Sequence, residues 1–226
     1  MSKILICIPI KPTLNPILLQ KCLELIGKLP AANPDHQVST YLDFERVPSE
    51  PGDCRPWSKV ARARNRMVSR IEPDNYDYLL WIDADVIDYP LDLPTKLIQG
   101  NKDGISSPMV MIEGGDTFYD WAAFILAGKD HIRPDYRERI EGRNINPNAP
   151  YWPTEPSEQI VDMDCTGTIC MVPSWIYKHC KHEDHPAFTD WFPLAKVCRD
   201  HGKRVTVDRS IKAVHAYLPK YGEAFH

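Results

Sequence analysis

Apolar and polar positions follow a strand–helix–strand–helix–strand order in the first part of the chain. Residues 3–9 form an apolar run that ends in proline, which predicts a short buried strand. Apolar side chains at helical spacing over residues 16–28 predict a helix, with Asn15 as its N-cap and Pro16 at its first position. The other elements predicted here are a strand at 37–43, a helix at 57–71 and a strand at 76–82.

This order predicts an α/β fold, because parallel strands joined by helices need right-handed crossovers. We expect a single domain over residues 1–226, with a central, mostly parallel twisted sheet flanked by helices. Ligands of such sheets bind at the carboxyl ends of the strands. The third strand runs directly into Asp83-Ala84-Asp85, so two carboxylates are expected at the ligand-binding edge.

The second half of the chain has a less regular pattern and shows no internal repeat. The predicted elements are strands at 105–112, 118–126, 167–172 and 203–208, a long loop at 128–160, and a helix from Asp190 to His201 that Gly202 closes. The last strand leads into residues 213–216. Prolines are frequent in the chain, which favours long, shaped loops over a helical bundle.

Composition narrows the class of protein. With 43% hydrophobic and 26% charged residues, the chain is ordinarily globular, and a net charge of −4 disfavours nucleic-acid binding without excluding it. The N-terminal apolar run is too short for a signal peptide, and no apolar stretch approaches the roughly 20 residues that span a bilayer. The seven cysteines include no CxxC pair, so we expect a soluble, cytoplasmic protein with free thiols.

Two groups of residues have the chemistry of metal ligands. Asp83 and Asp85, one residue apart after a buried strand, offer oxygen ligands to a hard divalent ion that also contacts substrate phosphates. Asp162-Met163-Asp164 has the same spacing, but we favour the first pair because the segment before it is more apolar. The other group could hold zinc and contains His179, Cys180, His182 and His185, although a polar helix end and loop is the reading we favour.

Two stretches resemble the GT-A-fold glycosyltransferases, closest to the family-2-like enzymes and the fungal mannan-polymerase type. They are Ala61-Arg62-Ala63-Arg64-Asn65 and Asp77-Tyr78-Leu79-Leu80-Trp81-Ile82-Asp83-Ala84-Asp85. The resemblance covers about residues 3–217 and is looser after 110. It implies a GT-A-like domain whose half at about 1–110 binds a nucleotide sugar, and whose half at about 111–226 binds the acceptor.

The resemblance also implies roles in donor binding. The loop after the first strand, with Pro9 and Lys11, would hold the nucleoside. Asp43, at the end of the second strand, would contact the base. Arg64 would reach the base or the diphosphate, and Asp83 would face the ribose. A turn acid and a surface helix charge are the alternatives for Asp43 and Arg64.

A metal site and an acceptor site complete the implied set. Asp83, Asp85 and a late histidine, His215, would bind Mn2+, which accepts imidazole more readily than Mg2+ does. Exposed aromatic rings can pack against the apolar faces of sugars. The candidates for such an acceptor platform are Trp121, Trp152 and Trp191, although each could equally anchor a loop or the core.

By the same resemblance, Asp190 would correspond to the carboxylate that deprotonates the acceptor in inverting members of the family. The match is partial, because Thr189 stands where many relatives have Glu, and an Asp at a helix start can simply be a cap. Asp164, just before Thr166-Gly167-Thr168, is the rival catalytic residue. Because the fungal relatives are retaining enzymes, the inverting outcome is the weaker part of this expectation.

The expected function is therefore metal-dependent transfer of a hexose from a nucleotide-diphosphate sugar to an acceptor hydroxyl. A glycan or glycoconjugate is the favoured acceptor, with a modified DNA base less favoured. Two alternatives remain, a nucleotide- or glycan-binding module without catalysis and a nucleotidyltransferase. The second would normally have a glycine-rich phosphate loop after the first strand, and residues 9–12 contain no glycine.

Overall fold

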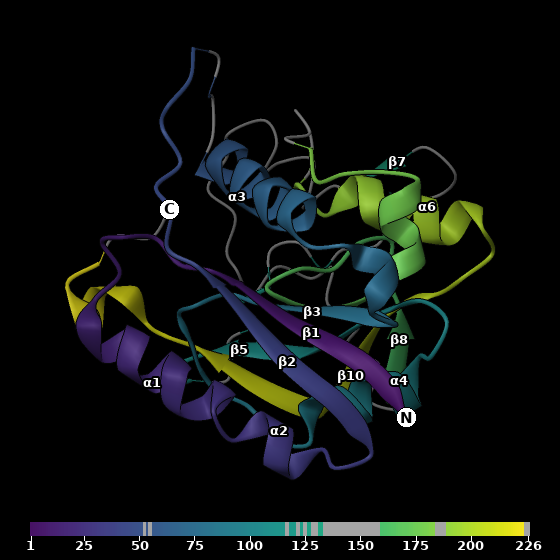
Figure 1. Cartoon of the computed structure of the whole chain (residues 1–226), viewed down its shortest axis with the longest axis horizontal. Helices are drawn as coiled ribbons and strands as arrows, with labels where there is room; N and C mark the ends of the chain where they lie inside the picture. The colour runs from purple at the N-terminus through teal and green to yellow at the C-terminus, as the bar shows by residue number, and fades with distance from the viewer. Residues whose placement is uncertain are drawn as a thin grey trace.

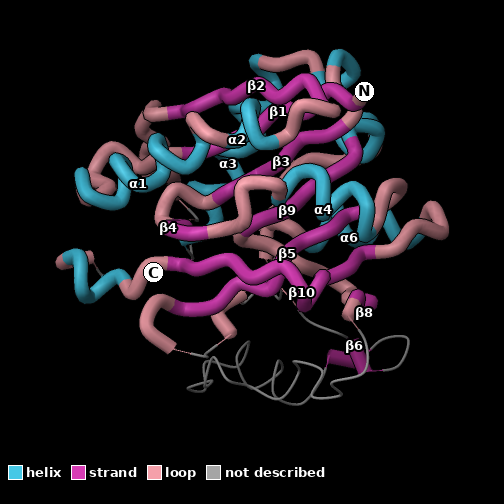
Figure 2. Tube along the Cα trace, turned by 90° about the horizontal axis from the view of Figure 1, so that it is seen from below, coloured by secondary structure: helices cyan, strands magenta, loops and turns pink. Residues whose placement is uncertain are grey.

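A computed structural model describes residues 1–51, 53, 56–115, 118–120, 123, 126–127, 131–132, 159–183 and 189–223. Over these residues, a central sheet is covered by helices on both faces (Figure 1). Helices α1, α2 and α4 lie on one face, and α3 and α6 lie on the other (Figures 1 and 2). The described helices include none that is long and apolar enough to cross a membrane.

The bounds of the elements are as follows. The strands are β1 (Ser2–Pro9), β2 (His36–Asp43), β3 (Tyr78–Ile82), β4 (Val86–Asp88), β5 (Ile105–Ile112), β6 (Leu126–Ala127), β7 (His131–Ile132), β8 (Ile160–Asp162), β9 (Ile169–Pro173) and β10 (Val205–His215). The helices are α1 (Pro16–Ile26), α2 (Leu29–Ala32), α3 (Pro56–Arg70), α4 (Leu93–Gly100) and α6 (Phe192–Asp200), with 3-10 turns η1 (Pro73–Asn75), η2 (Ser174–Lys178) and η3 (Leu218–Tyr221).

The main sheet has the order β2-β1-β3-β9-β5-β10-β4, with β8 paired to β10 (Figure 2). β1 runs parallel to β2 and β3, and β5 runs parallel to β10. β9 is antiparallel to β3 and β5, while β4 and β8 are antiparallel to β10. Among the described strands of this sheet, β1, β2, β3, β5 and β10 therefore share one direction. The predicted central, mostly parallel sheet flanked by helices is confirmed.

Alternation along β1 divides the core into two layers. Ile4, Ile6 and Ile8 pack with α1 and α4, whereas Leu5 and Cys7 pack with α3 and α6. Successive side chains of a strand point to opposite faces, so a strand without polar positions must be covered on both. The apolar run that predicted a buried strand therefore also requires helices on both faces of the sheet.

Hydrogen bonds hold β3 at both of its ends. Just before the strand, the side-chain carboxylate of Asp77 accepts a hydrogen bond from Lys3 N at 2.8 Å. At the other end, Asp83 N donates to Thr168 O at 3.1 Å, and Val86 N donates to Asp83 O at 3.0 Å in a tight turn. The segment 83–85 is thus fixed at the edge of the sheet where β1, β2 and β3 all end.

Two predictions about the second half of the chain need correction. The predicted strand at 118–126 is wrong over residues 118–120, because Phe118 makes only a single bridge to Met111 and the next two residues are irregular. The predicted strand at 203–208 is too short, because β10 continues to His215 through a shift in register between Asp208 and Lys212. Such a bulge lets a strand continue past polar positions that break its alternation.

The boundaries of other elements also differ from their prediction. The helix expected from Asp190 begins at Phe192, and no side chain caps it. Residues 131–132 and 160 belong to short strands at the margins of the loop predicted at 128–160, while 133–158 lie outside the described residues. Asn15 is confirmed as the cap of α1, since its side chain accepts a hydrogen bond from Ile17 N.

Candidate active site

Arg64 on α3 joins the end of β3 to the segment that precedes α6. Its Nη2 lies 2.8 Å from Asp83 Oδ1, and its Nη1 lies 2.6 Å from Asp190 Oδ2. The Trp191 ring covers the guanidinium, with Cζ 4.3 Å from the ring centroid. Only 3% of the Arg64 side chain is exposed, so two carboxylates and an aromatic face replace water around this charge.

The carboxylates on either side of Arg64 differ in their electrostatics. For Asp190, burial opposes ionisation, but Arg64 and His182 outweigh it and lower the pKa below its usual value. For Asp83, burial raises the pKa, and the charges of Asp85 and Asp190 add to this effect despite Arg64. Arg64 therefore stabilises the ionised form of both carboxylates, while burial and the repulsion from Asp85 and Asp190 keep the pKa of Asp83 raised.

Asp85 lies against His215 at the end of β10. His215 Nε2 is 3.1 Å from Asp85 Oδ1, and the imidazole stacks on Tyr119 with ring centroids 3.7 Å apart. His215 Nδ1 lies 2.8 Å from Ala216 O and must carry a proton, because a carbonyl oxygen can only accept. Although burial opposes it, Asp85 raises the pKa of His215, so a protonated Nε2 donates to the carboxylate.

This donor set suits a divalent cation. With Nδ1 donating to a carbonyl, a neutral His215 directs the lone pair of Nε2 at Asp85, and a cation between them would satisfy both groups. No group of three potential ligands gathers among the described residues. A metal here would therefore take Asp85 and His215 and complete its shell with substrate oxygens and water, as Mg2+ and Mn2+ often do.

Asp83 is predicted to bind both the metal and the ribose, and one of its carboxylate oxygens accepts a hydrogen bond from Arg64. Its side chain is 31% exposed, so it also reaches solvent at the edge of the sheet. Ala84 between the two acids is buried, whereas the Asp85 side chain is 21% exposed. The structure thus brings together four of the predicted residues, namely Arg64, Asp83, Asp85 and His215, and adds Asp190 through Arg64.

Asp190 also contacts a buried network that the sequence did not indicate. His182 Nδ1 lies 3.3 Å from Asp190 Oδ2, and Tyr177 Oη lies 3.3 Å from His182 Nε2. Trp81 on β3 donates to Tyr177 Oη at 2.7 Å. Burial lowers the pKa of His182, so the ring is neutral near neutral pH. His182, considered above for zinc, instead supports Asp190, and His185 lies outside the described residues.

A buried acid, Asp120, positions Asp83 indirectly, through the backbone of residues 167–168. It accepts hydrogen bonds from Gly167 N at 3.0 Å and from the Thr168 hydroxyl at 3.2 Å. Thr168 has φ of 55°, a left-handed conformation that is costly for a β-branched residue, and its carbonyl accepts from Asp83 N. The pattern that predicts a strand over residues 118–126 gives no indication of this role for Asp120.

Other predicted site residues lie in separate ion pairs. Asp43 accepts hydrogen bonds from Arg66 at 2.7 and 3.0 Å, and its backbone carbonyl accepts from Ile10 N. Pro9 is the register partner of Asp43 on the neighbouring strand. Lys11 pairs with Glu223 near the end of the described chain. The donor-side residues of β1 and β2 therefore lie at one edge, but not within the Arg64 cluster.

The remaining candidates are placed as follows. Asp164 pairs with Arg199 on α6. Trp191 is buried and packs on Arg64, so in this structure it supports the core and not an exposed platform. Trp121 and Trp152 lie outside the described residues.

Comparisons with known proteins gave structural neighbours only. No protein-family model matches the chain, and no curated protein matches it in sequence. Solved structures with related folds include GalNAc-T7 with UDP, GalNAc and Mn2+, at 10% identity and a TM-score of 0.48, covering 96% of this chain and 44% of that one. The chain thus spans less than half of that neighbour.

Two further neighbours show the spread of activities among these folds. A glycosyltransferase that acts in glycosylation of the PBCV-1 major capsid is 13% identical, with a TM-score of 0.36 over 77% of this chain and 61% of that one. CMP:2-keto-3-deoxy-manno-octonic acid synthetase in complex with CTP is 10% identical, with a TM-score of 0.44 over 95% and 90%.

The Arg64 cluster predicts a large loss of stability when its charge is removed. Arg64→Met leaves Asp83 and Asp190 without their buried cation, and we expect the free energy of unfolding to fall by about 3–5 kcal/mol. Arg70→Met is the matched control on the same helix, because Arg70 is half exposed and its pair with Glu45 is open to solvent. Urea denaturation followed by tryptophan fluorescence measures both. Equal, small losses in the two variants would contradict the account of a buried cluster.

Proposed function

We propose that the chain is a metal-dependent glycosyltransferase that moves a sugar from a nucleotide-diphosphate sugar to a hydroxyl group of a glycan or glycoconjugate. The observation that carries the proposal is the pairing of Asp85 with His215 at 3.1 Å, beside Asp83, where β3 ends. Two acids from the end of β3 and a histidine from the end of β10 thus lie at the edge where this sheet architecture binds ligands.

The chemistry of the donor explains why such a site is useful. Cleavage of the bond between sugar and diphosphate leaves negative charge on the leaving group, and a divalent ion bound there offsets that charge. Asp85 and His215 would hold the ion. The repulsion between Asp83 and Asp85, which contributes to the raised pKa of Asp83, favours a cation at this edge.

We propose that the nucleoside binds at the ends of the neighbouring strands β1 and β2. Ile10 N donates to Asp43 O at 2.8 Å, which fixes the loop after β1 against the end of β2. Asp43 is held by Arg66 and accepts from Glu45 N, so contact with a base would come from this ion pair and not from an isolated carboxylate. We also propose that Pro9 and Lys11, in the same loop, help to hold the nucleoside.

Asp190 is the proposed base that takes the proton of the acceptor hydroxyl, with inversion at the anomeric carbon. Arg64 and His182 lower its pKa, so it is ionised at neutral pH, which is the state a base requires. Its side chain is only 4% exposed in this structure, and it also positions Arg64. The two roles predict different kinetics, because a base acts on turnover and a positioning residue acts on donor affinity.

Donor binding provides the first test. In thermal-shift measurements with a panel of nucleotide-diphosphate sugars, one donor with Mn2+ should raise the melting temperature by about 5–10 °C at roughly 100 times its Kd. Asp85→Asn should abolish this response, whereas Asp88→Asn, an exposed acid on β4, should retain it. Slow donor hydrolysis should follow the same pattern.

The panel also separates the competing functions. Nucleoside triphosphates paired with sugar phosphates test for a nucleotidyltransferase, and turnover of these with release of pyrophosphate would replace the proposal. Binding of a nucleotide sugar without any hydrolysis or transfer would favour a module that has lost catalysis. Failure of every nucleotide sugar to stabilise the protein, with or without metal, would contradict the donor site itself.

The role of Asp190 is tested by the kinetics of donor hydrolysis. We expect Asp190→Asn to lower kcat by about 100-fold or more while the KM for the donor stays within a few fold, because a general base acts in the transition state. Asp164→Asn, the rival carboxylate paired with Arg199, should leave both constants nearly unchanged. A raised KM with an unchanged kcat in Asp190→Asn would instead assign it to positioning Arg64.

A further inference from the structure

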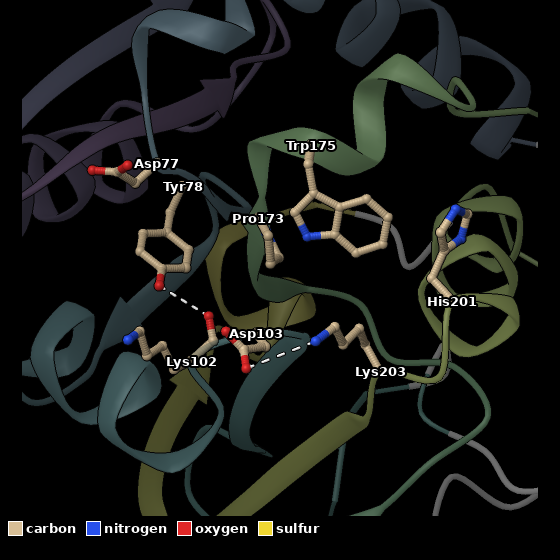
Figure 3. Close-up of a pocket in the computed structure, with 8 residues that line it drawn as sticks. All are labelled: Asp77, Tyr78, Lys102, Asp103, Pro173, Trp175, His201 and Lys203. Atoms are coloured by element: carbon tan, nitrogen blue, oxygen red, sulfur yellow. Dashed lines mark hydrogen bonds and ion pairs between the residues drawn. The ribbon is translucent and has the colours of Figure 1, made fainter.

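A cavity opens at the opposite edge of the sheet from Asp83. It has a volume of about 490 Å³ and lies where β3 begins and β9 ends, since Tyr78 and Pro173 are register partners in that pair (Figure 3). The other end of the same pair, Ile82 with Ile169, borders Asp83. The cavity is therefore separate from the candidate active site, although both are built on one pair of strands.

An aromatic surface forms one wall of this cavity. Trp175, on η2, is half-buried, and its indole lies between Pro173 and His201 (Figure 3). The His201 ring is tilted against it, with centroids 5.1 Å apart and planes at 58°. His201 Nδ1 donates to Val197 O at 2.9 Å, which orients the imidazole and does not use Nε2. A fixed indole beside an imidazole offers both a packing surface and a polar edge.

The charged residues around the cavity are balanced. Lys102 and Lys203 contribute two positive charges, and Asp77 and Asp103 contribute two negative charges. Lys203 Nζ and Asp103 Oδ2 are 3.9 Å apart, so they form a loose pair whose polar atoms stay accessible at the rim (Figure 3). Such a lining has no net field to attract a phosphate or a cation, but it offers both donors and acceptors.

The combination fits one class of ligand. Neutral sugars carry hydroxyl groups that both donate and accept, and their C–H faces pack on aromatic rings. The volume falls within the range of about 300–1,000 Å³ that is typical of small-ligand sites. A nucleotide would require a positive lining for its phosphates, which the two aspartates cancel.

We propose that this cavity binds a neutral oligosaccharide, with Trp175 as its packing surface and Lys203 and Asp103 as hydrogen-bonding partners. This proposal rests on the proposed function in one respect, because it takes the bound sugar to be part of the acceptor. The cavity would then hold the acceptor at a point away from the transfer site. The two places are separated by roughly 15 Å along β3, whose five residues are all buried. A chain of sugars that contacts both must therefore pass around the covered sheet and be longer than this distance.

The test measures glycan binding without donor or metal. The full chain is applied to an array of neutral and acidic glycans, and the strongest neutral oligosaccharide is titrated in solution by ligand-observed NMR. We expect Trp175→Ala to weaken binding by about tenfold and Trp175→Phe to weaken it less, because a smaller ring remains. Lys203→Ala and Asp103→Ala change exposed positions and should each weaken binding several fold with the fold intact.

The outcomes separate this inference from the proposed function. Each variant is also tested for Mn2+-dependent stabilisation by the nucleotide sugar that the panel identifies, and this response should equal that of the wild type. Absence of binding to any neutral glycan, or a clear preference for sulfated or phosphorylated glycans, would overturn the inference and leave the donor site standing. Binding that survives Trp175→Ala and Lys203→Ala together would place the glycan elsewhere and also overturn it.

Discussion

The buried charge of Arg64 constrains the arrangement of the rest of the site. A guanidinium excluded from water needs anionic partners with good geometry, and here they come from the end of β3 and from the segment before α6. α3 must therefore lie across the sheet so that Arg64 reaches Asp83 and Asp190 at once. Trp191 closes the cluster from the side of α6. Two ion pairs of one arginine thus fix α3, the end of β3 and the segment before α6 relative to one another.

The division of charge at this edge gives the site its proposed chemistry. Asp190 has Arg64 and His182 as partners, whereas Asp83 and Asp85 share the remaining attraction of Arg64 and that of His215. The backbone contributes as well, since Asp120 and the strained Thr168 hold the peptide on which Asp83 depends. Stability and the preference for a cation therefore arise from the same few contacts.

Much of the first half could be predicted because its signals are local. An apolar run, a capped helix and a pair of acids after a strand are each visible within a few residues, so β1, α1 and the position of Asp83 and Asp85 followed from sequence. Contacts between distant segments could not be predicted in this way. Asp190 lies 126 residues from Arg64, and the bulge that extends β10 to His215 depends on pairing with β5.

The central claim is that Asp85 and His215 bind a divalent ion together. Electron spin-echo spectroscopy of the protein with Mn2+ and a nucleoside diphosphate tests this directly, because a coordinated imidazole gives a characteristic nitrogen coupling. The account predicts one histidine nitrogen on Mn2+, which His215→Gln abolishes and which His201→Gln, at the distant cavity, leaves intact. Mn2+ bound without a nitrogen coupling, or with one that persists in His215→Gln, would contradict it.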